Sequence, residues 1–411
     1  MKSFSHQQIL EGSRAIALTI KNIAPAVISA YPITPQTHIV EDLAKFKADD
    51  QANYEYVRAE SEFAAASIIV GASATGVRVY SATSSQGLLL MTEVIYNIAG
   101  MRLPIVMTCA NRAVSAPINI WCDQQDVMTI RDAGWILLFA ENHQEAVNQH
   151  VVAFKIAEQL KLPVMVNVDG FILTHTYEPV IIPDSNIIKK YLPDYKPTIG
   201  QYLDPKNPAT LGLLATPAHY MKIRQKLHND LMASLKTIDQ EYKNFQKIFH
   251  NKLKIKKSID NGLIDNGLIE YTGPNNPDII LVAMGSVVGT IKDVVNNLVS
   301  DNKRKDNAPP DKVRQERIGI LKIKCFRPFP AEQILKILKS AKHIAVLDKS
   351  ISLGHIGCLA SDIKAVCQDK IQTKIQNFII GLGGRDVTGN MIKKIIREVK
   401  KGNDKTKFIE K

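Results

Sequence analysis

Short apolar runs alternate with stretches of helical periodicity across residues 1–180. The apolar runs cover residues 26–29, 78–82, 104–108, 134–139 and 163–168. Each run precedes a turn and a helical segment, and these helices are predicted to begin at Thr37, at Glu60, after Gln86 and at His143. The alternation is typical of βαβ units, so we predict an open parallel sheet with helices on both faces.

A single apolar stripe follows in residues 216–257, where the pattern changes to that of one long helix. Its members recur at spacings of three and four residues: Leu227, Leu231, Leu235, Ile238, Tyr242, Phe245 and Phe249. Packing on the helix's own domain is the commoner use of such a stripe, and a contact with another subunit is the alternative.

A second α/β region completes the chain, with predicted strands at residues 278–284, 317–323, 343–347 and 377–381. The short duplication at residues 260–269 predicts a linker or hairpin, and the polar, proline-terminated residues 301–310 predict an exposed loop. We therefore expect three parts. They are a domain over residues 1–257 with its helical extension at 216–257, a linker over 258–270, and a smaller α/β domain over 271–411.

The composition is that of a soluble globular protein. Of the 411 residues 45% are apolar and 22% are charged, which excludes fibrous and intrinsically disordered classes. The five cysteines never form a CxxC pair, which argues against a disulfide framework or zinc ribbon and indicates a reducing compartment. No segment near the N-terminus approaches about 18 uninterrupted apolar residues. We expect a cytoplasmic protein without a membrane segment.

The net charge of +12 is unevenly distributed. Residues 1–180 carry 12 basic and 17 acidic side chains, a net of −5, and the remainder carries 40 and 23, a net of +17. A solvated basic face explains this surplus most simply, and an anionic partner is the alternative. The lysines lack interleaved aromatic residues and any nucleic-acid motif, so nucleic acid is not an expected partner.

The sequence Tyr-Pro-Ile-Thr-Pro-Gln-Thr at residues 31–37 directly follows the first predicted strand. Strand-to-helix turns of this kind lie at the carboxyl edge of a parallel sheet, where ligands bind. Pro32 and Pro35 restrict the backbone on either side of Thr34. By residue type alone Thr34 is a helix cap or a ligand group, and the cap is the commoner role.

A second such turn contains Ser84, Ser85, Gln86 and Gly87. Small hydroxyl residues and a glycine allow a ligand to approach the backbone closely. Ordinary helix capping explains the same residues nearly as well.

Charged side chains occur near the same predicted edge. Glu60 and Glu62 begin a helix of small residues, where a buried carboxylate is suited to proton transfer, and only one of the two can face a ligand. Arg112 follows the third strand and can hold a carboxylate with two hydrogen bonds, although a surface ion pair is its commoner role. Asp123 and Gln124 open a polar cluster nearby.

These motifs occur together in the order seen in one family. The ordered segments are residues 31–35, Glu62 with 71–76, 83–87, 123–126, 169–171 and, in the second region, 285–286, 327–329 and 381–387. The chain resembles the alpha subunit of pyruvate:ferredoxin oxidoreductase, within the wider 2-oxoacid:ferredoxin oxidoreductases. This resemblance implies a pyrimidine-type parallel-sheet domain of thiamine diphosphate enzymes, followed by a smaller α/β domain like the carboxyl-terminal domain of transketolase.

The resemblance also implies roles for individual residues. The chain would supply the pyrimidine-binding half of a thiamine diphosphate site, in which Glu62 hydrogen-bonds the aminopyrimidine ring nitrogen. Glu62 fits the family spacing better than Glu60. Thr34 and Arg112 would bind the substrate carboxylate. Further residues implied to line the cofactor or the pocket are Pro32, Ile33, Ser84, Ser85, Gln86, Gly87, Asp123 and Gln124.

Two motifs that this chemistry needs are missing from the sequence. There is no Gly-Asp-Gly segment with a downstream asparagine for Mg²⁺ and the cofactor diphosphate, and no set of four suitably spaced cysteines for a [4Fe-4S] cluster. The resemblance therefore implies that this chain holds no metal for the reaction and is inactive alone. A beta subunit would bring the diphosphate site, and gamma- and delta-type subunits would bring further clusters.

The implied reaction converts pyruvate, coenzyme A and oxidised ferredoxin or flavodoxin to acetyl-coenzyme A, CO₂ and the reduced carrier, reversibly. A subunit for another 2-oxoacid, such as 2-oxoglutarate or a branched-chain acid, is one alternative. A non-catalytic regulatory partner of the same fold is another, and the joint presence of Thr34, Glu62 and Arg112 argues against it.

Overall fold

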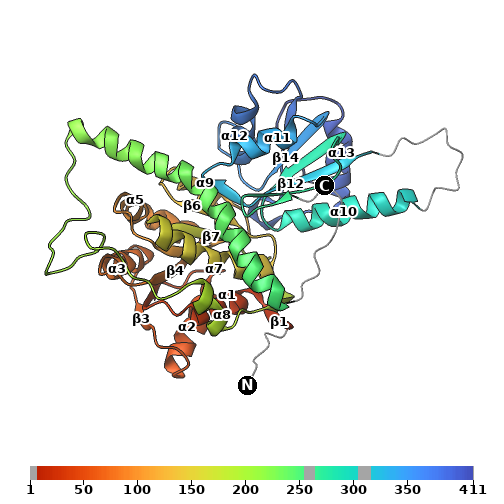
Figure 1. Cartoon of the computed structure of the whole chain (residues 1–411). Helices are drawn as coiled ribbons and strands as arrows, with labels where there is room; N and C mark the ends of the chain where they lie inside the picture. The colour runs from red at the N-terminus through yellow and green to blue at the C-terminus, as the bar shows by residue number, and fades with distance from the viewer. Residues whose placement is uncertain (1–6, 254–263, 304–315, 411) are drawn as a thin grey trace, which may run out of the picture. The chain divides into compact units, whose positions relative to one another are not determined.

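The computed structural model describes residues 7–253, 264–303 and 316–410 (Figure 1). It divides into two compact units. The first holds residues up to 256 together with Cys325–Phe329, and the second holds residues 257–324 together with Pro330–Lys411. Each unit is built on a seven-stranded sheet, which confirms the predicted α/β fold class.

The sheet of the first unit is parallel apart from one edge strand. Its strands are β2 (Val27–Ala30), β3 (Glu55–Arg58), β4 (Val79–Thr83), β5 (Val106–Asn111), β6 (Ile136–Phe139), β7 (Val164–Asp169) and β13 (Cys325–Arg327). Their order is β13-β6-β7-β5-β4-β2-β3, and β13 runs antiparallel to β6. Every residue of β4, β5, β6 and β7 is buried, as expected for strands covered on both faces.

Two groups of helices accompany this sheet. One group consists of α1 (Gly12–Ile23), α2 (Thr37–Ala48), α7 (His143–Leu160), α8 (Ser185–Tyr191) and α9 (Pro217–Leu253). The other consists of α3 (Glu62–Ala74), α4 (Ser85–Leu90), α5 (Thr92–Gly100) and α6 (Gln125–Thr129). A separate antiparallel pair joins β1 (Gln7–Glu11) to β8 (Tyr177–Ile181).

Side-chain caps are present at the starts of α3 and α7 and absent at the starts of α2 and α4. The predicted starts at Thr37 and His143 are confirmed. The start predicted at Glu60 is wrong by two residues, because the Ser61 side chain accepts the Ala64 N–H and so caps a helix that begins at Glu62. The helix expected after Gln86 begins at Ser85.

The apolar stripe of α9 serves the helix's own unit. α9 packs against α7 and α8, and four of the seven stripe residues are buried, namely Leu227, Ile238, Phe245 and Phe249. The rings of Phe245 and Phe249 stack at 4.1 Å, and both lie against Tyr191 of α8. Figure 1 shows α9 as the long green helix. These four residues are therefore buried within their own unit and are not kept for a contact with another subunit.

The second unit has its own sheet and hydrophobic core. Its strands are β9 (Ile264–Asp265), β10 (Ile269–Thr272), β11 (Ile279–Ala283), β12 (Ile318–Ile323), β14 (His343–Asp348), β15 (Ile375–Ile379) and β16 (Lys407–Phe408). Its helices are α10 (Val287–Lys303), α11 (Ala331–Leu338), α12 (Cys358–Cys367), the 3₁₀ turn η1 (Leu382–Gly384) and α13 (Gly389–Val399). The order β16-β15-β14-β11-β12 is parallel, and β10 and β9 add antiparallel strands.

Two predicted connections fall partly outside the described residues. Of the expected linker 258–270, residues 258–263 are not described, and the rest contributes to the β9–β10 hairpin at the edge of the second sheet. Of the loop expected at 301–310, residues 304–310 are not described, and residues 301–303 still belong to α10.

The strand β13 belongs to the first sheet although its sequence lies far into the second α/β region. Cys325 and Arg327 pair with Leu138 and Leu137 of β6. Phe326 is fully buried, and its ring meets that of Phe139 edge to face at 6.2 Å. A run of three residues carries no signal for the sheet it joins, so this pairing was not predictable from periodicity.

No helix within the described residues combines the length and apolar character needed to cross a lipid bilayer. The five cysteines are all described, buried and without a disulfide bond.

Candidate active site at the carboxyl edge of the first sheet

The candidate residues follow four strands that are neighbours in the sheet. Thr34 follows β2, Ser84 follows β4, Arg112 follows β5, and Asp169 ends β7, in the order β7-β5-β4-β2. Because these strands are parallel, their carboxyl ends meet at one edge. The fold therefore brings these candidate segments to one edge of the sheet.

Arg112 and Thr34 are in direct contact. The Arg112 Nη1 donates to the Thr34 carbonyl oxygen at 2.9 Å, and its Nε donates to the Asn119 carbonyl at 3.0 Å. Burial lowers the pKa of Arg112, against the opposing effect of Asp126, and a guanidinium still keeps its charge. The contact leaves a fixed, partly desolvated cation beside the exposed Thr34.

The turn that carries Thr34 is anchored by a buried glutamine. Gln36 Nε2 donates to the Ala82 carbonyl in β4 at 2.7 Å and to the Tyr31 carbonyl at 3.3 Å. The Ile33 N–H reaches the Gln36 Oε1 at 3.4 Å, so the side chain bridges both ends of the turn. Pro32 is exposed and Ile33 half-buried on this anchored turn.

Asp126 is the centre of the polar network at this edge. Its fully buried carboxylate accepts the backbone N–H groups of Ser85 and Arg112, both at 3.0 Å, and the Asn111 side-chain amide at 3.0 Å. Burial raises the pKa of Asp126, and these N–H donors oppose the rise. One carboxylate thus ties the ends of β4 and β5 together.

The serine hydroxyls of the second turn bond to the protein itself. Ser84 Oγ donates to the Ala110 carbonyl at 2.7 Å, and Ser85 Oγ contacts the Ala113 carbonyl and the Gln86 side chain, each at 2.5 Å. Both serines therefore hold the turn in place. The Gln86 Nε2 is a buried donor without a protein partner.

The polar cluster after Arg112 reaches the end of β7. Gln124 Nε2 donates to Asp169 at 3.0 Å, and the buried Gln124 Oε1 has no protein partner. Asp123 is buried and accepts the Gln125 N–H at 2.9 Å. A partnerless acceptor and the Gln86 donor at one sheet edge leave polar atoms for a ligand to satisfy.

Glu62 lies buried against Gly87. A Cβ atom at Gly87 would come within 2.7 Å of the Glu62 Oε1 and 2.6 Å of the Thr83 Oγ1, so only glycine leaves these side chains where they are. Thr83 Oγ1 is buried and has no protein partner. Glu60, by contrast, is exposed. Of the two carboxylates only Glu62 is enclosed at the sheet edge.

Adding a methyl group at Gly87 tests this enclosure. We expect Gly87→Ala to lower the free energy of unfolding by about 1–3 kcal/mol, because the new Cβ would overlap Glu62 and Thr83. Urea unfolding followed by circular dichroism measures the change. Gly71→Ala is the matched control, since Gly71 lies in α3 with open space at its Cβ position and should gain about 0.5–1 kcal/mol. Equal unfolding energies for the two variants would contradict the packing.

Most of the first unit matches one family model. The model described as "Pyruvate flavodoxin/ferredoxin oxidoreductase, thiamine diP-bdg" covers residues 19–244, more than half of the chain. The chain belongs to the pyruvate:ferredoxin oxidoreductase family. A second model, "Pyruvate:ferredoxin oxidoreductase core domain II", covers residues 277–392. The family resemblance is thereby confirmed in both regions.

Relatives match over nearly the whole chain. The pyruvate synthase subunit PorA of Methanosarcina barkeri is 44% identical over 96% of this chain and 92% of its own. PorA of Methanocaldococcus jannaschii is 43% identical over 98% of this chain and 97% of its own. The ketoisovalerate oxidoreductase subunit VorA of Pyrococcus abyssi is 38% identical over 96% and 94%. These identities favour the pyruvate reading over the branched-chain alternative.

A solved structure supports the fold. The 2-oxoglutarate:ferredoxin oxidoreductase from Magnetococcus marinus, solved with 2-oxoglutarate, coenzyme A and succinyl-CoA, aligns with a TM-score of 0.67 at 18% identity. The alignment covers 96% of this chain and 65% of that one. At this identity the likeness concerns the fold alone.

The residues present fit the pyrimidine half of thiamine diphosphate. An aminopyrimidine offers ring nitrogens and an amino group, and Glu62, Thr83 and Gln86 present a buried carboxylate, hydroxyl and amide beside a glycine. Neither Thr83 Oγ1 nor Gln86 Nε2 has a protein partner. A polar ring whose edge reached these orphaned atoms would give them the hydrogen bonds they lack.

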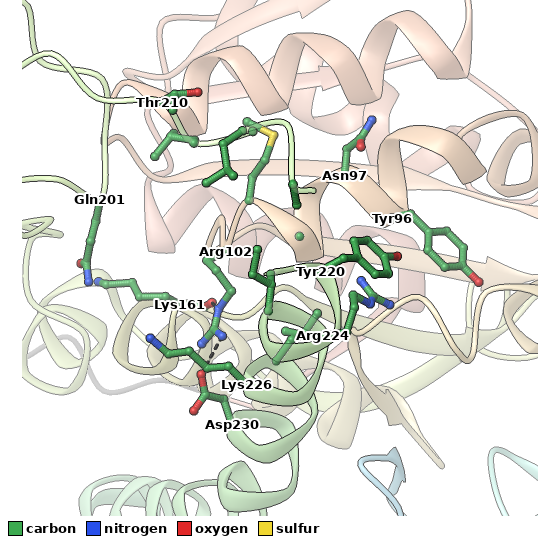
Figure 2. A pocket seen from close by; sticks show the side chains of 18 of the residues that line it. Tyr96, Asn97, Arg102, Lys161, Gln201, Thr210, Tyr220, Arg224, Lys226 and Asp230 are labelled. Atoms are coloured by element: carbon green, nitrogen blue, oxygen red, sulfur yellow. Dashed lines mark hydrogen bonds and ion pairs between the residues drawn. The ribbon is translucent and has the colours of Figure 1, made fainter. Parts of the chain in front are cut away.

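A separate cavity of about 940 Å³ lies away from the candidate residues. It is lined by the ends of α5 and α7, residues from 200–215 and the first turns of α9 (Figure 2). Two of its four cations have assigned partners: Arg102 Nη1 donates to Asp230 at 2.6 Å, and Lys161 Nζ donates to the Glu158 carbonyl at 2.7 Å. None of the predicted site residues lines it.

Sequence reasoning missed two residues that position the site. Asp126 belongs to the Asp-Gln-Gln-Asp cluster, from which only Asp123 and Gln124 were chosen, and Gln36 belongs to the turn chosen for Thr34. The sequence signal that could have identified them is a carboxylate or amide residue in a short connection between two buried strands. Which member of each motif turns inward depends on the tertiary fold.

Proposed function

We propose that this chain is the alpha subunit of a pyruvate:ferredoxin oxidoreductase. The assembled enzyme converts pyruvate, coenzyme A and oxidised ferredoxin or flavodoxin to acetyl-coenzyme A, CO₂ and the reduced carrier, and works in both directions. Family membership and the higher identity of the pyruvate synthase relatives support this substrate.

The observation that carries the proposal is the series of contacts from Glu62 to Thr34. Glu62 lies against Gly87, and Gly87 belongs to the helix that begins at Ser85. Ser85 contacts the Ala113 carbonyl and shares the Asp126 carboxylate with the Arg112 N–H. Arg112 in turn holds Thr34. A buried carboxylate and a held cation thus belong to one connected network.

Each of these residues has a chemical task. Thiamine diphosphate, when bound, supplies the nucleophilic carbon and the electron sink for decarboxylation of a 2-oxoacid. Glu62 would hydrogen-bond the pyrimidine ring nitrogen of the bound cofactor and exchange a proton with it. Arg112 would bind the 2-oxoacid carboxylate through the N–H groups that do not already donate to the Asn119 and Thr34 carbonyls, and the Thr34 hydroxyl would add a further donor. Gln36 and Asp126 keep the two strand ends in place.

The surface at this edge fits a subunit boundary. Large apolar side chains are exposed after the ends of β2, β3, β5 and β7, namely Tyr31, Phe63, Ile118, Trp121 and Ile172. Ile118 is 82% exposed and Trp121 53%. Apolar groups around a polar site favour a protein partner that covers them. We assign that partner as the beta subunit, which brings Mg²⁺, the diphosphate site and a cluster, with gamma- and delta-type subunits completing the complex.

Purification of the native complex tests the proposal. We expect partner chains, brown iron–sulfur absorbance, and release of CO₂ from pyruvate that requires thiamine diphosphate and exceeds the release from 2-oxoglutarate or 2-oxoisovalerate. A colourless lone chain would overturn the assignment. A coloured complex that prefers another 2-oxoacid would keep the family and replace the substrate.

A further inference from the structure

Three metal-binding side chains from separate segments converge outside the network described above. Glu11 ends β1, His38 lies in the first turn of α2, and His175 lies in the turn between β7 and β8. One potential ligand atom from each lies within 4.8 Å of the other two. We propose that Glu11, His38 and His175 form a binding site for a divalent transition-metal ion of the Zn²⁺ type.

A hydrogen bond from outside the trio orients the His175 ring, and the His38 ring already faces Glu11. His38 Nδ1 lies 2.7 Å from the Glu11 Oε1, and His175 Nδ1 lies 2.7 Å from the Thr174 Oγ1. An ion bound there would replace the proton between His38 Nδ1 and Glu11 Oε1, so His38 would bind it through Nδ1. When the His175 Nδ1–H donates to Thr174, the lone pair of His175 resides on Nε2. Histidines that bind metals characteristically have the other ring nitrogen held by a carboxylate or a similar acceptor.

The rings themselves are already close together. The centroids of His38 and His175 are 4.5 Å apart with planes inclined at 36°, and the Phe171 ring covers His175 at 4.7 Å. Zn²⁺ bonds of about 2.0–2.2 Å place tetrahedral ligand atoms roughly 3.3–3.6 Å apart. The side chain of His38 is 47% exposed, so rotation of this side chain can supply the remaining approach.

The donor set selects the class of ion. Two imidazole nitrogens and one carboxylate oxygen suit Zn²⁺ and its first-row neighbours, whereas Mg²⁺ and Ca²⁺ prefer oxygen ligands alone. None of the five cysteines belongs to this group of ligands, so the site would contain no thiolate. Three protein ligands leave a fourth position of a tetrahedral ion for water.

An ion held there would fasten three segments to one another. His38 follows the Thr34–Gln36 turn at the start of α2, and His175 follows Gly170. A Cβ atom at Gly170 would lie 2.7 Å from the Pro35 ring and 2.5 Å from the Asn111 carbonyl, so the two segments already touch. The ion would therefore stabilise the turn that bears Thr34 through the segments next to it in the fold. The proposal does not depend on which reaction the candidate active site performs.

The experiment titrates the tag-free full chain with Zn²⁺ in competition with a chromophoric chelator, and counts bound metal by mass spectrometry. We expect one Zn²⁺ per chain and a higher melting temperature with the ion. Co²⁺ should give a spectrum of nitrogen and oxygen ligands without a thiolate charge-transfer band. His38→Gln and His175→Gln should each weaken binding at least tenfold, and Thr174→Val by about 10–100-fold.

His228→Gln is the matched control, because His228 is an exposed histidine on α9 and should leave binding unchanged. The exposed position of His38 allows its replacement without loss of the fold, which circular dichroism verifies. Failure to bind Zn²⁺ at micromolar concentration would overturn the proposal. Binding that persists in His38→Gln and His175→Gln, or that shows thiolate bands, would overturn it equally.

Discussion

Replacing Glu62 with glutamine is expected to lower the turnover of the assembled enzyme by about 10²–10⁴-fold. The amide keeps the size of the side chain in its position beside Gly87 but cannot hold the proton of a carboxyl group. Steady-state release of CO₂ from pyruvate by the purified complex measures the loss. Subunit composition and iron–sulfur absorbance should stay unchanged, because the substitution leaves the packing intact.

Glu60→Gln supplies the control for this variant. Glu60 is exposed two residues before Glu62, and its replacement should leave turnover at the level of the parent enzyme. Full activity in Glu62→Gln would show that Glu62 does not take part in the reaction. A comparable loss in Glu60→Gln would show that the effect is not specific to Glu62.

Replacing Arg112 with alanine should chiefly weaken binding of the 2-oxoacid. Loss of a desolvated cation that pairs with a substrate carboxylate costs about 2–5 kcal/mol. That cost corresponds to a rise in KM of roughly 30- to 4,000-fold, because each 1.4 kcal/mol changes an equilibrium constant tenfold. Initial rates over a range of pyruvate concentrations measure KM and kcat separately.

Two further variants separate the effect of the Arg112 charge on substrate binding from the effect of its hydrogen bonds to the protein. Arg112 also holds the Thr34 and Asn119 carbonyls, so Arg112→Lys keeps the charge while losing the fork, and should recover part of the affinity. Arg131→Ala removes a partly exposed arginine of the same unit and should leave KM unchanged. A KM in Arg112→Ala equal to that of the parent would place the carboxylate elsewhere.

The sequence predicted the elements well wherever one strong local signal determined them. Buried parallel strands are continuous apolar runs, and the predicted strands of both units match the observed ones to within three residues at either end, as such runs allow. The stripe of α9 likewise predicted a helix, and α9 runs from Pro217 to the last described residue of this part of the chain, Leu253. Such signals are local, since they depend only on spacing within one segment.

Features that depend on distant segments could not be predicted in this way. Asp126 is a hub because β4 and β5 end beside it, and its neighbour Gln125 looks equally polar in the sequence. The metal-binding trio combines residues 11, 38 and 175, which no spacing rule connects. Ser84 and Ser85 were expected to face a ligand or to cap a helix, and the structure uses both hydroxyls in bonds to carbonyl groups.

The pairing of β13 with β6 bears on how the chain can be divided. A fragment that stops near residue 256 would retain β6 without its outer neighbour, leaving backbone groups around Leu137 and Leu138 unpaired along a bare sheet margin. Exposed margins of this kind recruit strands from other molecules and promote aggregation. The boundary between the family's two sequence regions is therefore a poor place to cut, because the first unit is finished only by residues translated some seventy positions later.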